Sequence, residues 1–183
     1  THRGSSAASD VYKRQAYLAT LDALKMAGVD NNYLDNPRIG IVAGSGGAST
    51  RIMVESSDIA RNRGPKRIGP YGVTKSMSSS ISAIVATALK LKGINYSISS
   101  ACATSAHCIG HAADLIKNGQ QDIVIAGGSD DEHWSSSCLF DAMGALSSNF
   151  NADPTIASRP YDSNRDGFVI SGGAGMLILE EEE

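Results

Sequence analysis

Residues 93–106 read GINYSISSACATSA, an alternating apolar and polar run followed by one cysteine among small residues. The alternation predicts a strand over residues 93–99. Apolar residues then recur at helical spacing until Asn118 and Gly119, where a helix is expected to end. Cys102 is therefore predicted to lie at a strand-to-helix turn, on the first turn of the helix.

A cysteine in this place has two possible roles. Free N–H groups and the positive end of the helix dipole favour a thiolate there. The same N–H groups can stabilise the oxyanion that develops when a thiolate attacks a carbonyl. The competing interpretation is ordinary packing, because free cysteine is among the most buried residue types.

Further motifs on both sides of Cys102 favour the first role. Together they resemble the β-ketoacyl-[acyl-carrier-protein] synthases, the condensing enzymes of fatty acid synthesis, over roughly residues 16–183, and they are most similar to the type I bacterial members. The motifs, in chain order, are residues 41–47 (IVAGSGG), 69–71 (GPY), 95–110 (NYSISSACATSAHCIG), 124–128 (VIAGG), 140–147 (FDAMGALS) and 159–169 (RPYDSNRDGFV).

Composition restricts the class of protein further. The chain has 183 residues, a net charge of −3 and 42% hydrophobic residues, which suits an α/β protein and does not favour nucleic acid or an anionic membrane as partner. No apolar run reaches the roughly 18 residues that a membrane helix needs. The three cysteines form neither a disulfide framework nor a metal-ligand spacing, so we expect no metal and a cytoplasmic location.

Helices alternate with apolar strands along the chain, which predicts a parallel or mixed sheet covered on both faces. The resemblance implies an α/β, thiolase-like fold, of which residues 16–183 would be a partial N-terminal domain without the first strand and the second half. Residues 1–15 match nothing in the family and are predicted to be a disordered or foreign leader. The predicted helices are residues 16–27, about 50–60 and 76–91, and the remaining predicted strands are 38–43, 122–127 and 175–179.

The resemblance also implies site residues. Cys102 would take an acyl group from the phosphopantetheine thioester of an acyl carrier protein, with no other cofactor. Gly46, Met77, Phe140 and Phe168 would line the acyl pocket, with Gly46 at its far end, although core packing explains the two phenylalanines equally well.

The resemblance also implies two catalytic histidines in the second half of the fold. His107 is not expected to replace them. It lies five residues after Cys102, so the two side chains would diverge by roughly 140° around a helix. A packed or hydrogen-bonded histidine is the expectation for His107, and similarly for His111 and His133. Buried packing is the expectation for Cys108 and Cys138.

Residues 61–67 (RNRGPKR) place four basic residues among turn formers. A solvated loop explains most such runs. The resemblance nevertheless implies an acidic carrier protein as partner, and we expect Arg63, Lys66 and Arg67 to dock it.

Three functional interpretations stay open from the sequence. The first is a condensing enzyme that works as a homodimer at full length. The second is a thiolase-type enzyme acting on coenzyme A esters. The third is an inactive fragment or interaction module.

Overall fold

The computed structural model describes residues 11–47 and 49–182. They form two compact units. One comprises the described residues up to Asp131 together with those from Gly173 onward, and the other comprises Glu132–Gly172.

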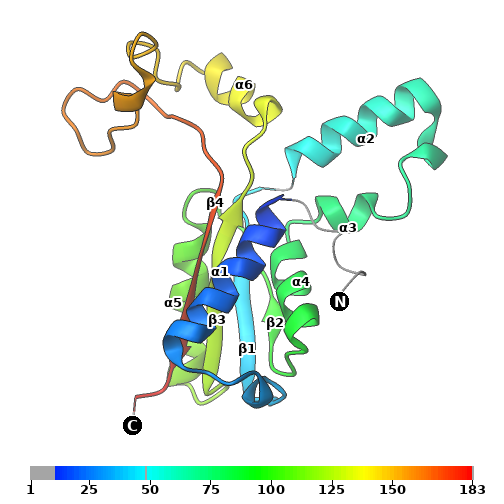
Figure 1. Ribbon diagram of the computed structural model, residues 1–183, viewed down its shortest axis with the longest axis vertical. Coiled ribbons are helices and arrows are strands. Elements are labelled where there is room, and N and C mark those ends of the chain that lie inside the picture. Colours follow the sequence, from blue (N-terminus) through cyan, green and yellow to red (C-terminus); the bar gives the residue numbers. More distant parts are fainter. Residues whose placement is uncertain (1–10, 48, 183) are drawn as a thin grey trace. The chain divides into compact units, whose positions relative to one another are not determined.

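The first unit is built on a four-stranded sheet (Figure 1). Strands β1 (Ile39–Gly44), β2 (Asn95–Tyr96) and β3 (Ile123–Asp130) are parallel, and β4 (Gly173–Glu180) pairs antiparallel with β3. The strand order is β2-β1-β3-β4. The prediction of a mixed sheet is confirmed.

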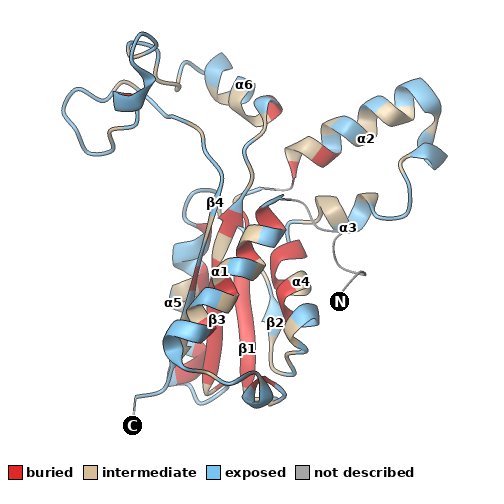
Figure 2. Ribbon diagram, viewed as in Figure 1, coloured by how far each residue is buried: buried red, intermediate tan, exposed pale blue. Residues whose placement is uncertain are grey.

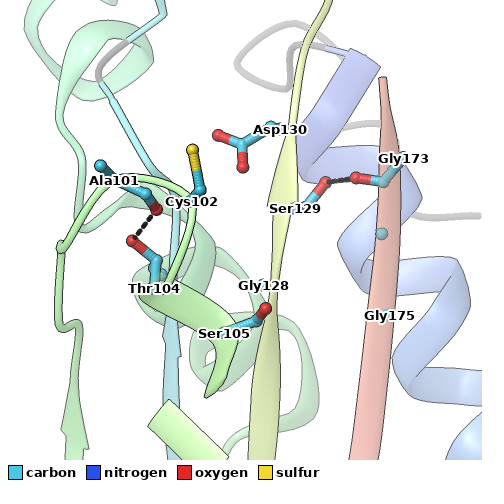
Figure 3. A pocket seen from close by; sticks show the side chains of 11 residues that line it. Ala101, Cys102, Thr104, Ser105, Gly128, Ser129, Asp130, Gly173 and Gly175 are labelled. Atoms are coloured by element: carbon cyan, nitrogen blue, oxygen red, sulfur yellow. Dashed lines mark hydrogen bonds between the residues drawn. The ribbon is translucent and has the colours of Figure 1, made fainter. Parts of the chain in front are cut away.

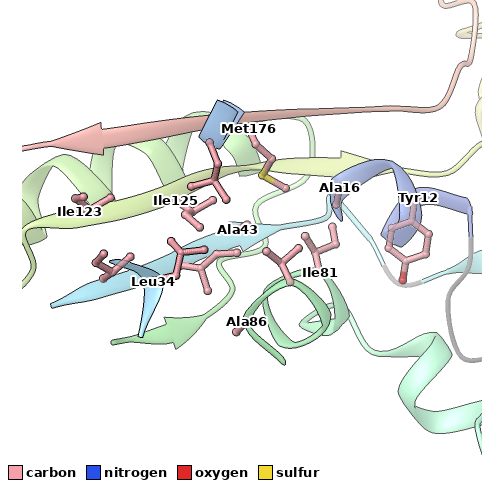
Figure 4. Packing of buried hydrophobic residues seen from close by; sticks show 13 residues of the cluster. Tyr12, Ala16, Leu34, Ala43, Ile81, Ala86, Ile123, Ile125 and Met176 are labelled. Atoms are coloured by element: carbon pink, nitrogen blue, oxygen red, sulfur yellow. The ribbon is translucent and has the colours of Figure 1, made fainter. Parts of the chain in front are cut away.

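Helices cover both faces of this sheet, as the sequence predicted. Helices α1 (Val11–Ala27) and α4 (Ser80–Leu89) pack on one face, and α5 (Thr104–Lys117) packs on the other. Side chains alternate between the faces because successive residues of a strand point in opposite directions. Isoleucines of β1 and β3 join α1 and α4 in the cluster drawn in Figure 4, and they belong to the buried centre of Figure 2. The opposite cluster contains Val42, Val124 and Ala126 from the strands and Cys108, Ala112, Leu115 and Ile116 from α5.

Three local predictions are wrong. The strand predicted over residues 93–99 is only Asn95–Tyr96, because the hydroxyls of Ser97 and Ser99 bond to the carbonyls of Ala43 and Ser45 in place of a continued ladder. The helix predicted over 76–91 is divided into α3 (Gly72–Ser76) and α4.

That division has a local cause. The Ser80 hydroxyl bonds to the carbonyls of Thr74, at 2.8 Å, and Met77, at 2.6 Å, and such serine contacts compete with a continuous helix. The third correction concerns α1, which begins at Val11 and buries Tyr12 and Lys13. Residues 11–15 are therefore helical and belong to the fold, whereas residues 1–10 of the predicted leader lie outside the described residues.

A long helix and a basic turn precede α3. Helix α2 (Thr50–Arg63) begins at the cap Ser49, whose side chain accepts a hydrogen bond from Ile52 N–H. It ends at Arg63, three residues later than predicted, with Gly64 as its cap, and the 3-10 helix η2 (Pro65–Arg67) follows. A further 3-10 helix, η1 (Asn31–Leu34), links α1 to β1.

The second unit, Glu132–Gly172, holds helix α6 (Trp134–Ala142) and the 3-10 helix η3 (Pro154–Ile156). The His133 side chain caps α6 by accepting a hydrogen bond from Ser135 N–H, so its predicted structural role is confirmed. Asp166 closes the loop that follows α6, because its carboxylate accepts from the N–H groups of Ser148 and Asn149, both at 2.8 Å.

No helix within residues 11–47 and 49–182 is long and apolar enough to cross a membrane.

Candidate active site

Cys102 lies on an exposed turn immediately before α5. The helix begins at Thr104 with Ala103 as its cap, so Cys102 precedes the first helical turn. The prediction that Cys102 lies on that turn is wrong. Ala101 has a φ of +49°, the left-handed region that costs a residue with a Cβ roughly 1–2 kcal/mol. Such backbone strain persists only where surrounding contacts fix it.

Those contacts come from the start of α5. The N–H of Ala103 donates to Ser100 O at 3.1 Å, and the N–H of Thr104 donates to Ala101 O at 3.1 Å. The Thr104 hydroxyl also donates to Ala101 O at 2.7 Å and accepts from Ser100 N–H at 2.8 Å. The residues on both sides of Cys102 are thus fastened to one helical turn.

Glycines in β1 and β3 provide the space for this turn. A Cβ added to Gly44 would lie 2.0 Å from Ile98 O and 2.8 Å from Thr104 Cγ2. A Cβ added to Gly128 would lie 3.2 Å from Ser105 Cβ. Glycines at these two strand positions therefore allow the close backbone approach around Cys102.

A cavity of about 210 Å³ opens beside Cys102 (Figure 3). Its walls come from the Cys102 turn, from the ends of β1 and β3 and from the start of β4. The lining residues are Gly44, Ala101, Cys102, Thr104, Ser105, Gly128, Ser129, Asp130, Gly173, Ala174 and Gly175.

Asp130 is a residue of this cavity that sequence reasoning missed. Its carboxylate accepts hydrogen bonds from the Ser45 hydroxyl at 2.6 Å and from Gly46 N–H at 3.0 Å. It therefore fixes the loop after β1 to the end of β3. The available signal was its position as the last residue of a buried parallel strand whose neighbour ends in a glycine-rich loop.

The other thiols differ from Cys102. Cys108 is fully buried, which confirms its predicted packing role, and burial raises the pKa of its thiol. Cys138 is exposed, so its predicted burial is wrong; its thiol donates to Ser135 O at 3.2 Å, which leaves it on the surface of α6.

The two histidines of α5 are each paired with a hydroxyl. His107 Nδ1 lies 2.5 Å from Ser100 Oγ, and His111 Nε2 lies 2.6 Å from the Tyr96 hydroxyl. Both agree with the expectation of hydrogen-bonded helix histidines.

The predicted pocket residues are not all brought together. Gly46 lies against the Cys102 turn, where an added Cβ would be 3.0 Å from Ala101 O. Met77 is a half-buried residue that caps the end of α3. Phe140 and Phe168 contact each other edge-on within the second unit, with ring centroids 5.7 Å apart. Their role in an acyl pocket stays a prediction.

The predicted docking residues are exposed. Arg63 is the last residue of α2, and Lys66 and Arg67 belong to η2. They are placed where a partner can reach them, and their docking role stays a prediction. Across residues 11–47 and 49–182 no group of three or more histidine, cysteine or carboxylate side chains could hold a metal ion.

Sequence comparison defines the class of protein to which this sheet and its cysteine turn belong. Residues 3–183 match the family described as "Beta-ketoacyl synthase, N-terminal domain", and the chain belongs to that family.

Two curated relatives show which members of the family are similar to this chain. The chain is 55% identical over 170 residues to 3-oxoacyl-[acyl-carrier-protein] synthase 1 of Escherichia coli, covering 92% of this chain and 42% of the relative. It is 52% identical over 169 residues to the synthase 1 of Haemophilus influenzae, again with 92% and 42% covered. The chain thus spans well under half the length of these curated relatives.

Solved structures agree on the fold. A β-ketoacyl synthase from Burkholderia phymatum matches with a TM-score of 0.88 and 27% identity, over 98% of this chain and 44% of that one. A ketosynthase solved in complex with a type II acyl-carrier protein matches with a TM-score of 0.84 and 30% identity, over 94% and 44%.

Proposed function

We propose that this chain carries the nucleophile of a 3-oxoacyl-[acyl-carrier-protein] synthase, with Cys102 as the acylated residue. The observation that carries the proposal is the exposed thiol of Cys102, held on a strained turn directly before α5 and beside a cavity. A helix N-terminus stabilises a thiolate, which is the reactive form of cysteine.

The proposed reaction at Cys102 has two stages, of which the first is acyl transfer. The Cys102 thiolate attacks the carbonyl carbon of an acyl thioester, and a carbon–sulfur bond to Cys102 forms. The bond to the carrier sulfur then breaks, and the released thiolate takes up a proton. In the second stage a malonyl thioester loses carbon dioxide, and its carbanion attacks the acyl-Cys102 carbonyl and regenerates the thiolate. We assign the decarboxylation to the longer protein, because the curated relatives extend far beyond this chain.

The test uses a chimera in which this chain replaces the matching segment of the Escherichia coli relative, so that the rest of the enzyme is present. The chimera is incubated with a radiolabelled acyl thioester of acyl carrier protein, and the modified peptide is mapped. Acylation confined to Cys102 and lost in Cys102→Ala supports the proposal. Acylation elsewhere, or equal acylation in Cys102→Ala, would contradict it.

The same assay separates the two thioester classes. A condensing enzyme of fatty acid synthesis should use the carrier-protein thioester in preference to the coenzyme A thioester of the same acyl group. Faster acylation from coenzyme A would favour a thiolase-type enzyme instead.

The proposed carrier-protein surface is formed by Arg63, Lys66 and Arg67. These three basic side chains are exposed and follow one another across the end of α2 and η2, and positive charge accelerates encounter with an acidic partner. The similar ketosynthase that was solved with its acyl-carrier protein supports a partner of this class.

This docking surface is tested by charge reversal. Arg63→Glu with Lys66→Glu should slow carrier-dependent acylation of the chimera at low salt and leave acylation by the acyl-coenzyme A thioester unchanged. Lys25→Glu with Lys117→Glu makes the same change of net charge on α1 and α5 and serves as the matched control. Equal slowing in both double variants would show a general charge effect and no docking site.

We also propose a cytoplasmic homodimer with no cofactor beyond the phosphopantetheine of the carrier. Three free thiols suit a reducing compartment, and the short edge strand β2, with Tyr96 partly exposed, leaves one side of the sheet open to a second copy. The molar mass of the chimera in solution tests the dimer.

A further inference from the structure

The Cys102 turn is fastened by one contact between two side chains. Ser100 Oγ lies 2.5 Å from His107 Nδ1, which joins the residue two positions before Cys102 to the fourth residue of α5. The other bonds described for the turn, among Ser100, Ala101, Ala103 and Thr104, each involve a backbone atom. The side-chain contact can therefore be removed without changing the backbone.

The contact commits the His107 imidazole to Ser100. Either the hydroxyl or the ring nitrogen can be the donor, and in both cases Nδ1 is occupied by Ser100. This contact links His107 to Cys102 through the conformation of residues 100–101. Ala101 needs such support, because its φ of +49° is strained.

A second pair on the same helix provides an internal comparison. His111, one turn after His107, lies 2.6 Å from the hydroxyl of Tyr96 and bonds in the same manner. Tyr96 is six residues before Cys102 and lies in β2, outside the strained turn. The two pairs share their chemistry and differ in what they hold.

We propose that His107, acting through Ser100, is a positioning residue that holds the Cys102 thiol at the N-terminus of α5. Its consequence for catalysis rests on the proposed acylation of Cys102, whereas its effect on thiol reactivity does not. Without the contact, residues 100–101 leave the strained conformation part of the time, and the thiolate loses the favourable field of the helix terminus.

The test is the rate of Cys102 alkylation by iodoacetamide, measured in the full chain by peptide mapping. His107→Ala should slow alkylation at neutral pH about two- to tenfold, the range that corresponds to the net stabilisation of one hydrogen bond, about 0.5–1.5 kcal/mol. Ser100→Ala should slow it equally, and the double variant should show no additional loss. His107→Asn places an amide oxygen near the position of Nδ1 and should restore most of the rate.

Three controls keep the result interpretable. His111→Ala removes the matched pair and should leave the Cys102 rate within about twofold. The exposed thiol of Cys138, in the other unit, reports general changes in reagent or folding, and circular dichroism confirms that each variant is folded. An unchanged Cys102 rate in His107→Ala, no recovery in His107→Asn, or equal slowing in His111→Ala would overturn the proposal.

The alkylation experiment can reject the positioning role of His107 without rejecting the proposed enzyme function, and the reverse also holds. Iodoacetamide needs no carrier protein and no second domain. A normal dependence of alkylation on His107 with no acylation by carrier thioesters would retain the positioning role and reject the proposed enzyme activity.

Discussion

The parallel strands β1 and β3 are fastened differently at their two ends. At the amino end, long polar side chains bridge the strands. Arg38 Nε donates to the Asp122 carboxylate at 2.7 Å, and the buried Gln121 amide donates to Pro37 O and accepts from Ile94 N–H. These contacts tolerate small shifts, because long side chains can adjust their torsions.

At the carboxyl end, short serine hydroxyls form the hydrogen bonds that join the strand ends. Ser99 donates to Ser45 O at 3.0 Å, and Ser45 donates to the Asp130 carboxylate at 2.6 Å. Close backbone approach occurs at both ends, because a Cβ added to Gly44 would lie 2.0 Å from Ile98 O and one added to Gly93 would lie 2.4 Å from Ile39 O. The ends differ in the side chains that join the strands, which are short hydroxyls at the end with the cysteine and a long guanidinium and a long amide at the opposite end. Short side chains compensate less for displacement, so the end with the cysteine fixes backbone positions more tightly.

Among the substitutions that test this difference between the two ends, Gly44→Ala is expected to have the largest effect on stability. The new Cβ would be 2.0 Å from Ile98 O, a backbone atom that cannot turn away, so the Cys102 turn must move. We expect a loss of about 3 kcal/mol or more in the free energy of unfolding, at the upper end for overpacking, and slower alkylation of Cys102. Urea denaturation measures the first effect and peptide mapping the second.

Gly47→Ala is the matched control, because nothing lies within 4 Å of the Cβ position and the residue is in the same loop. Its unfolding midpoint should stay near that of the parent chain. Equal midpoints for Gly44→Ala and the parent would show that the carboxyl end is not fixed by close approach.

A second test compares two thiols six residues apart. Cys102 is exposed, whereas Cys108 is fully buried against β1 and β3 and has a raised thiol pKa because of that burial. In the native chain iodoacetamide should label Cys108 more slowly than Cys102 by a factor on the order of 100, since labelling requires local opening. In concentrated urea the two rates should converge. Similar native rates would mean that α5 does not protect its packed face.

Much of this arrangement could be predicted from the sequence. The apolar runs over residues 38–43 and 122–127 predicted two buried strands, and the observed strands Ile39–Gly44 and Ile123–Asp130 agree within one to three residues. The alternating run before Cys102 and the helical spacing after it predicted the turn on which Cys102 lies. These signals are local, and the structure that they describe is local as well.

The remaining features depend on contacts between distant residues. Residues 97–99 alternate as a strand does, but the Ser97 hydroxyl bonds to Ala43 O in β1 and the Ser99 hydroxyl to Ser45 O just after it, both more than 50 residues away. Lys13 falls within the predicted leader because residues 1–15 match nothing in the family, yet its ammonium is buried on the carbonyls of Thr74 and Lys75. Asp130 gave no motif, and its role follows from the pairing of β1 with β3.

A smaller effect is expected from Ala101→Gly. Glycine removes a left-handed strain of roughly 1–2 kcal/mol but loses about 0.4–1 kcal/mol through the greater freedom of the unfolded chain. The difference predicts a small gain in the free energy of unfolding, of about 0.5 kcal/mol. Alkylation of Cys102 should nevertheless slow, because glycine allows conformations that alanine excludes at this turn. A stability gain together with faster alkylation would show that the strain does not serve the thiol.

The smallest effect is expected at the opposite end, from Arg38→Gln. The hydrogen bond from Arg38, together with its charge, lowers the pKa of Asp122 in the folded chain. A lowered folded pKa contributes stability above the unfolded carboxyl pKa, about 3.9, and this contribution is lost as the pH falls through the folded value. Arg38→Gln should therefore lower the melting temperature slightly at neutral pH, less at high salt because both side chains are partly exposed, and progressively less in acid. Alkylation of Cys102 should be unchanged. Slower alkylation of Cys102 in Arg38→Gln would show that the two ends are coupled through β1 and β3, and the distinction between an end joined by long side chains and an end joined by short hydroxyls would fail.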